Sequence, residues 1–222
     1  MTLLALIRHA PTAWSNEGRM QGRTDVPLAA PLPDWRWPAA LDGFQVIASP
    51  LRRAVETARL LGVSAVPESR LTEMDWGDWE GETLAALRAR LGAEMENAEA
   101  QGLDFRPPGG ESPRDVQARV APLLRDVAGA GEPVAAITHK GVIRAIFAQA
   151  AGWDMREKPP ARLSWEAAHL FRLDRNGAPS IHELNVTLAR HSRESGNRGQ
   201  ATERLPLAPR LRGGDETEIP RP

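Results

Sequence analysis

The sequence contains no cysteine among its 222 residues. This absence excludes disulfides, thiolate catalysis and cysteine-ligated metal sites. An excess of one charge is also lacking, because 28 Lys and Arg residues face 29 Asp and Glu residues. Such a balance creates no overall field that attracts nucleic acid or an anionic membrane, so we expect neither as a partner. Any affinity for an anion must come from a local cluster of cations.

Long hydrophobic runs are missing as well. No apolar window reaches the length of about 20 residues that a membrane-spanning helix needs. The apolar run at residues 3–7 is too short for the core of a signal peptide and has no basic region before it. We therefore expect a soluble, cytoplasmic protein, and its length fits one sizeable domain.

Three short apolar runs end in polar residues that can do chemistry. The runs span residues 3–7, 44–48 and 134–137, and they lead into Arg8-His9, into Ser49 and the Arg52-Arg53 pair, and into Thr138-His139. Continuous runs of this length are typical of strands buried on both faces of a parallel sheet. Helical patterns alternate with them, which favours an α/β fold.

Local signals predict where the remaining elements begin and end. A helix is expected from Ser49 as N-cap and Pro50 as first helical residue to Gly62, and another follows His139. Further helices are expected over 83–101 and from Ser112, where Pro122 predicts a kink or a break. Asn176-Gly177 predicts a hairpin. The expected fold is a three-layer αβα sandwich with a mainly parallel central sheet and a small helical cap segment over about 83–112.

The composition changes at about residue 189. From there to residue 222 the chain is rich in Arg, Gly, Pro and Glu and has no apolar period. Such a segment cannot bury enough surface to offset its ordering entropy, so we predict a catalytic domain over 1–188 and a disordered tail over 189–222. A nucleic-acid-binding arm is disfavoured, because seven Arg are set against five acidic residues there.

The carboxyl edge of the predicted sheet is the expected site, since ligands of open α/β sheets bind there. The three apolar runs end at this edge, so we expect Arg8, His9, His139 and one Arg of the 52–53 pair to lie there. Burying these cations together without an anion costs several kcal/mol, so a phosphate is the natural ligand. We favour Arg53 over Arg52, because neighbours on a helix differ by about 100° and only one can face the site.

Five segments resemble motifs of the histidine phosphatase superfamily. They are LIRHAPTAWSNEGRMQGRTDVPL, SPLRRAVETA, LTEMDWGDWEG, PPGGES and THKGVIRA. The first is similar to the family's Arg-His-Gly-x-Thr, its Asn and its Gln-Gly-x-x-Asp-x-Pro-Leu, and the last to its His-Gly-Gly-x-Ile-Arg. The segments run in the family's order between residues 3 and 145. Each motif alone is moderately specific, whereas five in order are very specific.

The resemblance implies a role for each matching residue. It makes His9 the nucleophile and Glu73 the proton donor, with Asp75 as the competing donor. The residues that it implies for binding the phosphoryl group or the rest of the substrate are Arg8, Arg53, His139, Asn16, Arg23, Thr24 and Lys140. No metal ligand pattern stands at the strand ends, so neither a metal nor a cofactor is expected.

Three positions carry expectations of their own. The pKa of Glu73 should be raised, and a desolvated position beside Trp76 and Trp79 would supply that shift. Ala10 replaces the family's Gly, which is tolerable unless its φ is positive. Lys140 also replaces a Gly of the family. Its positive charge either shifts the substrate preference toward more acidic esters or is simply that of a solvated lysine in the first turn of a helix.

The implied function is hydrolysis of small-molecule phosphomonoesters through a phosphohistidine, without a metal. The partner is then a small phosphate ester, and the oligomeric state stays open. Within the phosphatases, α-ribazole phosphatases of cobalamin synthesis and broad-specificity sugar-phosphate phosphatases both fit. A cofactor-dependent phosphoglycerate mutase is a rival, although the 66 positions between Glu73 and His139 match the shorter phosphatase branch. A phosphohistidine-protein phosphatase and a non-catalytic phosphate-binding regulatory module are further alternatives, and a binder has no use for a proton donor.

Overall fold

The computed structural model describes residues 1–188. The tail that was predicted to be disordered, residues 189–222, lies outside the described residues. No helix in the described part is both long enough and apolar enough to cross a membrane.

A six-stranded mixed sheet forms the centre of the described domain, with the strand order β3-β2-β4-β1-β5-β6. The strands are β1 (Thr2–Arg8), β2 (Gln45–Ala48), β3 (Val66–Pro67), β4 (Val134–Thr138), β5 (Ala167–Leu173) and β6 (Pro179–Thr187). The first four strands in space are parallel, and β5 and β6 are antiparallel. The mainly parallel sheet and the C-terminal hairpin are therefore as predicted.

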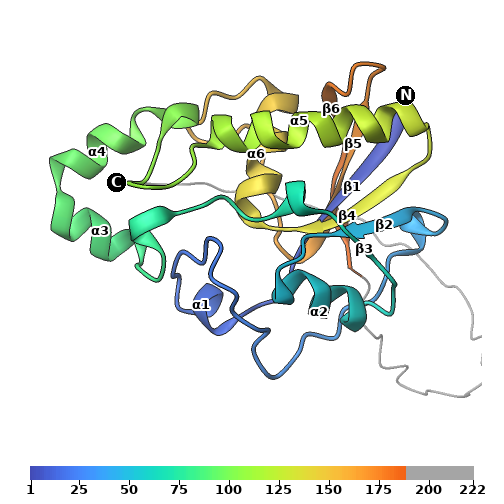
Figure 1. Ribbon diagram of the computed structural model, residues 1–222, viewed down its shortest axis with the longest axis horizontal. Helices are drawn as coiled ribbons and strands as arrows, with labels where there is room; N and C mark the ends of the chain where they lie inside the picture. The colour runs from blue at the N-terminus through green and yellow to red at the C-terminus, as the bar shows by residue number, and fades with distance from the viewer. Residues whose placement is uncertain (189–222) are drawn as a thin grey trace, which may run out of the picture. The chain divides into compact units, whose positions relative to one another are not determined.

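Helices cover both faces of this sheet (Figure 1). The α-helices are α1 (Ala13–Asn16), α2 (Arg52–Leu60), α3 (Leu84–Leu91), α4 (Ala93–Glu99), α5 (Pro113–Ala130) and α6 (Lys140–Ala151). Helix α2 packs against one face, and α5 and α6 pack against the other. This arrangement confirms the three-layer αβα prediction. Helices α3 and α4 lie beyond the sheet in Figure 1, within the segment that was predicted to form a cap.

The side chains of β1 show why both faces must be covered. Leu4 and Leu6 join the core under α5 and α6, whereas Ala5 and Ile7 join the core under α2. All four are almost fully buried. Alternate side chains of a strand point to opposite faces, so an unbroken apolar run requires two cores.

The expected start of the second helix is wrong. Helix α2 begins at Arg52 and its N-cap is Leu51, not Ser49. The Ser49 hydroxyl instead lies 2.7 Å from His139 Nε2. Asp25 satisfies one main-chain donor in the first turn of α2, because its carboxylate accepts the Arg52 N–H at 2.7 Å. The Ser49 hydroxyl also accepts the Leu51 N–H at 3.3 Å, so Ser49 bonds within the loop before α2 and across to the end of β4 without being the N-cap.

Two further helix predictions need correction. The pattern over 83–101 divides into α3 and α4 at Gly92, which has a φ of +52°. Helix α5 continues through Pro122 without the predicted break. Proline removes one main-chain hydrogen bond, but the buried face of α5 on both sides of Pro122 holds the helix against the core. The predicted capping box at Ser112 is present.

Candidate active site

Three strand ends lie level at the carboxyl edge of the sheet. The N–H of His9 donates to Thr138 O, and the N–H of Ser49 donates to Ile137 O, both at 2.9 Å. These bonds extend the parallel pairing of β1, β4 and β2 by one residue. His9, Ser49 and His139 are therefore brought together by strand register.

The His9 imidazole is held in one tautomer. Its Nδ1 lies 2.8 Å from Ala10 O, and because a carbonyl only accepts, Nδ1 carries the proton. The lone pair is therefore on Nε2. Burial, and then the charges of Arg8 and Arg53, hold the pKa of His9 well below its usual value, so the ring is neutral at pH 7. A neutral ring with a free Nε2 is the form that can attack phosphorus.

The residue after His9 is positioned from α2. The N–H of Ala10 donates to Thr57 Oγ1 at 2.8 Å, and that hydroxyl donates to Arg53 O at 2.7 Å. Ala10 is not among the described non-glycine residues with a positive φ, which are Met155 and Asn185. The substitution of Ala for the family's Gly therefore brings no backbone strain at this position.

Arg53 and His139 form a buried pair behind His9. Arg53 Nε donates to His139 Nδ1 at 3.2 Å, so His139 carries its proton on Nε2 and donates it to Ser49 Oγ. The rings of His9 and His139 are 5.2 Å apart between centres. Burial is the largest cause that lowers the pKa of His139, followed by the charges of His9 and Arg53. Arg53 is fully buried beside His139 but does not line the cavity, whereas Arg52 is exposed and pairs with Glu56.

The loop around residues 22–24 is bonded to Arg53. The guanidinium donates to Gly22 O at 2.7 Å and to Thr24 O at 2.8 Å. The Thr24 hydroxyl donates to Glu80, which also accepts the N–H groups of Arg23 and Thr24. The side chain of Arg23 forms ion pairs with the carboxylates of Asp75 and Glu111. Thr24 and Arg23 thus bond to protein groups, and sequence reasoning missed the role of Glu80 in holding this loop.

Arg8 is the cation beside His9 that has spare hydrogen-bonding capacity. Its Nε is buried and has no hydrogen-bond partner among the described residues. Its guanidinium lies 5.7 Å from the centre of the Trp165 ring. Burial lowers the pKa of Arg8, and the charge of Glu73 opposes that shift. A buried donor without a partner is costly, and an anion beside His9 would satisfy it.

The buried carboxyl group of Glu73 lies against the first turn of α6. It accepts the N–H of Met74 at 2.8 Å and that of Gly141 at 3.0 Å. Its residue exposure is 7%. Burial raises the pKa of Glu73, although the two N–H groups and the charges of Arg53 and Arg8 oppose the shift. The raised pKa is in the direction expected, and desolvation is its largest cause. Of the two tryptophans expected beside Glu73, Trp76 lines the same cavity, whereas Trp79 packs with Leu87 and Met95.

A cavity of about 570 Å³ opens onto these groups. Of the predicted site residues, those that line it are Arg8, His9, Glu73 and Lys140. Its outer wall includes Leu84, Arg88 and Glu99 from α3 and α4, so the two cap helices do border the site. Asn16 lines a second hollow of about 120 Å³, which also reaches Arg8 and His9. Arg53, His139, Arg23, Thr24 and Asp75 are not among the lining residues of either space.

Comparison with known proteins decides the family. The family model described as histidine phosphatase superfamily (branch 1) matches residues 4–187. The chain belongs to this superfamily. It is 31% identical over 203 residues to a 2,3-bisphosphoglycerate-dependent phosphoglycerate mutase of Methylobacterium radiotolerans, covering 83% of this chain and 90% of that protein. It is 34% identical to a glucosyl-3-phosphoglycerate phosphatase of Mycolicibacterium vanbaalenii over 172 residues, 67% of this chain and 74% of the relative.

Solved structures agree on the fold. A mycobacterial glucosyl-3-phosphoglycerate phosphatase, solved with VO3, superposes with a TM-score of 0.67 at 24% identity. The match covers 85% of this chain and all of that structure. At this identity the likeness supports the α/β fold of the superfamily. Within residues 1–188, His, Asp and Glu side chains form no group of three or more that is arranged to hold a metal ion.

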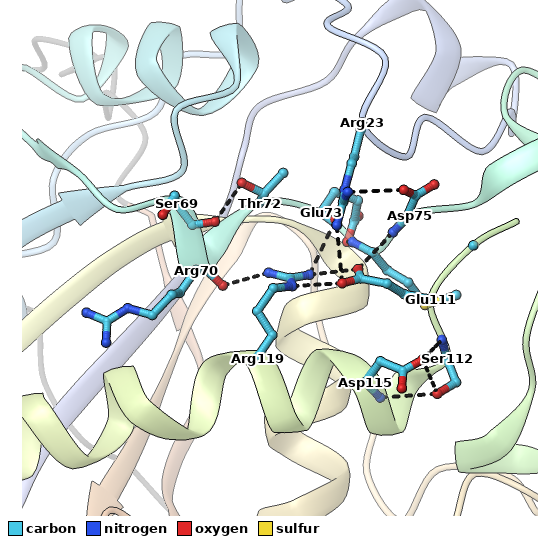
Figure 2. Close-up of polar contacts among 12 residues, drawn as sticks. Arg23, Ser69, Arg70, Thr72, Glu73, Asp75, Glu111, Ser112, Asp115 and Arg119 are labelled. Atoms are coloured by element: carbon cyan, nitrogen blue, oxygen red, sulfur yellow. Dashed lines mark hydrogen bonds and ion pairs between the residues drawn. The ribbon is translucent and has the colours of Figure 1, made fainter.

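A polar network holds the loop that carries Glu73 in this member of the superfamily (Figure 2). Arg119 on α5 makes a bidentate pair with Glu111 and donates to Arg70 O at 2.7 Å. Glu111 accepts the N–H of Asp75, and Arg23 bridges the carboxylates of Asp75 and Glu111 at 3.2 Å each. Sequence reasoning gave Glu111 and Arg119 no role, although the PPGGES motif contains Glu111.

The geometry separates the two candidate proton donors. Asp75 pairs with Arg23 and accepts the N–H of Gly77, whereas Glu73 lines the cavity beside His9. Glu73 is thus the better placed donor of the two.

Replacing Glu111 by Gln should weaken the network in a pH-dependent way. Burial acts to raise the pKa of Glu111, but the hydrogen bonds from Arg119 and from Asp75 N–H outweigh it and lower the pKa. A lowered folded-state pKa stabilises the fold above the unfolded-state pKa, and this gain is lost as pH falls through the folded-state value. At pH 7 we expect Glu111→Gln to lose about 1–3 kcal/mol in urea unfolding.

The gap between wild type and Glu111→Gln should therefore shrink as the pH is lowered from 7 toward the folded-state pKa. Glu183→Gln, at an exposed position on β6, is the matched control and should show no comparable gap. A gap that stays constant with pH would show that Glu111 contributes through packing and not through charge.

Adding a methyl group at Gly141 should displace Glu73. A Cβ there would lie 2.5 Å from Glu73 Oε1 and 3.0 Å from Met74 Cβ. A displacement of about 1 Å of a catalytic group can lower the rate about 100-fold, so Gly141→Ala should reduce kcat/KM by that order. Gly129→Ala on α5, where a Cβ meets nothing within 4 Å, is the control and should keep full activity. Equal activity of the two variants would contradict the placement of Glu73.

Proposed function

We propose that this protein is a phosphatase that hydrolyses small-molecule phosphomonoesters through a phosphohistidine on His9, without a metal ion. One observation carries the proposal. A neutral imidazole with its lone pair on Nε2 and a buried carboxyl group with a raised pKa line the same cavity, next to a cation with an unpartnered donor. Nucleophile, proton donor and anion-binding group are the three parts that phosphoryl transfer needs.

In the first step, His9 Nε2 attacks phosphorus and the bond from phosphorus to the ester oxygen breaks. The leaving oxygen takes the proton of Glu73, so an alcohol departs and Glu73 becomes a carboxylate. Positive charge that develops on the imidazole is stabilised through Nδ1–H by the Ala10 carbonyl. Arg8 offers its free donor to the phosphoryl oxygens, which gain charge in the transition state.

His139 and Arg53 act from behind His9. His139 Nε2 donates to Ser49 Oγ, and an anionic phosphoryl oxygen is a stronger acceptor than a hydroxyl. We expect the phosphoryl group to take this N–H. Three of the five N–H groups of Arg53 bond to protein groups, and its side chain does not line the cavity, so we expect Arg53 to act on the anion mainly through its charge.

In the second step, the Glu73 carboxylate takes a proton from water. The water oxygen bonds to phosphorus, the bond from phosphorus to Nε2 breaks, and inorganic phosphate leaves. His9 returns to its neutral form and Glu73 to its protonated form, so the enzyme is regenerated. Burial favours the protonated form of Glu73 in both the first and the last state.

A phosphoglycerate mutase is the second candidate, supported by the similarity to the relative from Methylobacterium radiotolerans. Its first step is the same, but the phosphoryl group passes to a second hydroxyl of the substrate and not to water. Phosphorus NMR of a reaction with 3-phosphoglycerate and 2,3-bisphosphoglycerate separates the two: we expect release of inorganic phosphate, and 2-phosphoglycerate that accumulates without inorganic phosphate would favour the mutase. α-Ribazole phosphate, sugar phosphates and glucosyl-3-phosphoglycerate belong in the substrate panel.

The covalent intermediate is tested by rapid quenching. Wild type mixed with a phosphorus-labelled ester in excess chelator should carry label that is stable to alkali and lost in acid, as expected of a P–N bond. His9→Ala should carry no label and should lose activity by at least about 10³-fold, because the nucleophile is gone. Label on the variant would remove His9 as the nucleophile. Loss of wild-type activity in chelator would remove the metal-free mechanism.

The role of Glu73 is tested by the leaving group. Glu73→Gln should slow hydrolysis of an alkyl phosphate by about 10²–10⁴-fold, because an alkoxide must be protonated to leave. For 4-nitrophenyl phosphate, whose phenolate leaves without a proton, the loss in kcat/KM, which reports the step that forms the phosphohistidine, should be far smaller. Asp75→Asn is the matched variant and should lower kcat/KM equally for both esters. Equal losses of kcat/KM for the two esters in Glu73→Gln would mean that Glu73 does not protonate the leaving group.

A further inference from the structure

Two cations on α6 extend along the wall of the cavity from the catalytic end. Lys140 is the first residue of α6, directly after His139, and Arg144 follows one turn later. Both line the cavity that contains His9 and Glu73. Residues four apart lie on the same face of a helix and differ by about 6 Å along its axis. Each is therefore placed at a different depth of the same cavity.

Lys140 and Arg144, like Arg8, differ from the remaining cations of the wall in their partners. The ion pairs of those other arginines are Arg19 with Glu17, Arg88 with Glu99 and Arg156 with Asp154. Lys140 and Arg144 have no carboxylate partner within residues 1–188. Lys140 Nζ lies 5.4 Å from the Trp165 ring centre, and the Arg144 guanidinium lies 5.3 Å from that of Trp153.

Bringing these cations together has a cost, which is reduced at Lys140 because that residue is exposed to solvent, whereas Arg144 is half-buried. Partial desolvation lowers the pKa of Lys140, and the charges of Arg8 and Arg144 lower it further, against a smaller opposing influence of Glu73. Desolvation also lowers the pKa of Arg144. Like charges four apart on a helix repel, and a lysine in the first turn opposes the helix dipole. A contact with an indole offsets only part of this cost.

The Trp165 ring links these cations to the catalytic end. Arg8 and Lys140 both lie against it, at 5.7 and 5.4 Å from its centre. Arg8, Lys140 and Arg144 therefore form a series that starts beside His9 and continues along α6. An anion at Arg8 alone leaves the two α6 cations without a counter-charge.

We propose that Lys140 and Arg144 form a second oxyanion subsite, so that the preferred substrates are phosphomonoesters with a further carboxylate or phosphate group. This inference rests on the proposed function for the first group, which binds at His9 and Arg8. The second group lies toward α6, a few bonds from the ester oxygen. A carboxylate and a second phosphate share the chemistry that the subsite recognises.

The subsite is tested with matched ester pairs. Glycerol 3-phosphate and 3-phosphoglycerate differ by a carboxylate, and fructose 6-phosphate and fructose 1,6-bisphosphate differ by a phosphate. In wild type, kcat/KM should be at least about tenfold higher for one or both of the more acidic partners, because a charge-assisted hydrogen bond contributes about 1.5–3 kcal/mol. The pair with the larger ratio identifies carboxylate or phosphate as the second group.

Substitutions locate the effect. In the Lys140→Met, Arg144→Gln double variant, the ratio of kcat/KM between the more acidic and the less acidic ester should fall to about one. Most of this change should come from a higher KM for the more acidic ester. Arg90→Gln removes a positive charge outside the cavity and should leave the ratio unchanged. A double variant that keeps the wild-type ratio, or a wild type without preference in either pair, would overturn the subsite while the phosphatase function stands.

Binding to an inactive protein separates the subsite from the chemistry. In the His9→Ala background, calorimetry should show tighter binding of 3-phosphoglycerate or of fructose 1,6-bisphosphate than of the less acidic partner. Adding Lys140→Met and Arg144→Gln should remove that difference. If wild type hydrolyses no ester but this binding difference appears, the proposed function fails and the subsite remains. Equal binding within both pairs would overturn the subsite.

Discussion

The hydrogen bond from His9 Nδ1 to the Ala10 carbonyl decides which nitrogen of the imidazole can react. It leaves the lone pair on Nε2, and the arrangement of the site follows from that choice. The N–H of Ala10 is in turn held by Thr57 on α2, the helix that also carries Arg53. A single helix thus orients the nucleophile and supplies the buried cation behind it.

Burial sets both protonation states that the chemistry needs. Desolvation disfavours the charged form of every group, so it lowers the pKa of His9 and raises that of Glu73. Burial therefore favours the unprotonated form of His9 and the protonated form of Glu73, the two forms that the proposed chemistry requires. The nearby arginines reinforce the shift of His9 and oppose that of Glu73, so for Glu73 burial is the stronger influence.

The sequence predicted the strands and their shared edge, because each depends on a local apolar run. It did not predict the bond of Ser49 to His139 or the start of α2, since these depend on strand register. It also missed the network of Glu111, which joins segments 36 positions apart at the Asp75 N–H. Contacts between distant segments leave no periodic signal in the chain.

The central claim concerns the tautomer and charge of one of the five histidines. Nitrogen NMR of protein labelled in its histidine rings, with His9 assigned by comparison with the His9→Ala variant, measures both directly. Between pH 6 and pH 8 the account predicts a neutral His9 ring with its proton on Nδ1. A ring that is doubly protonated at pH 6, or that carries its proton on Nε2, would contradict it.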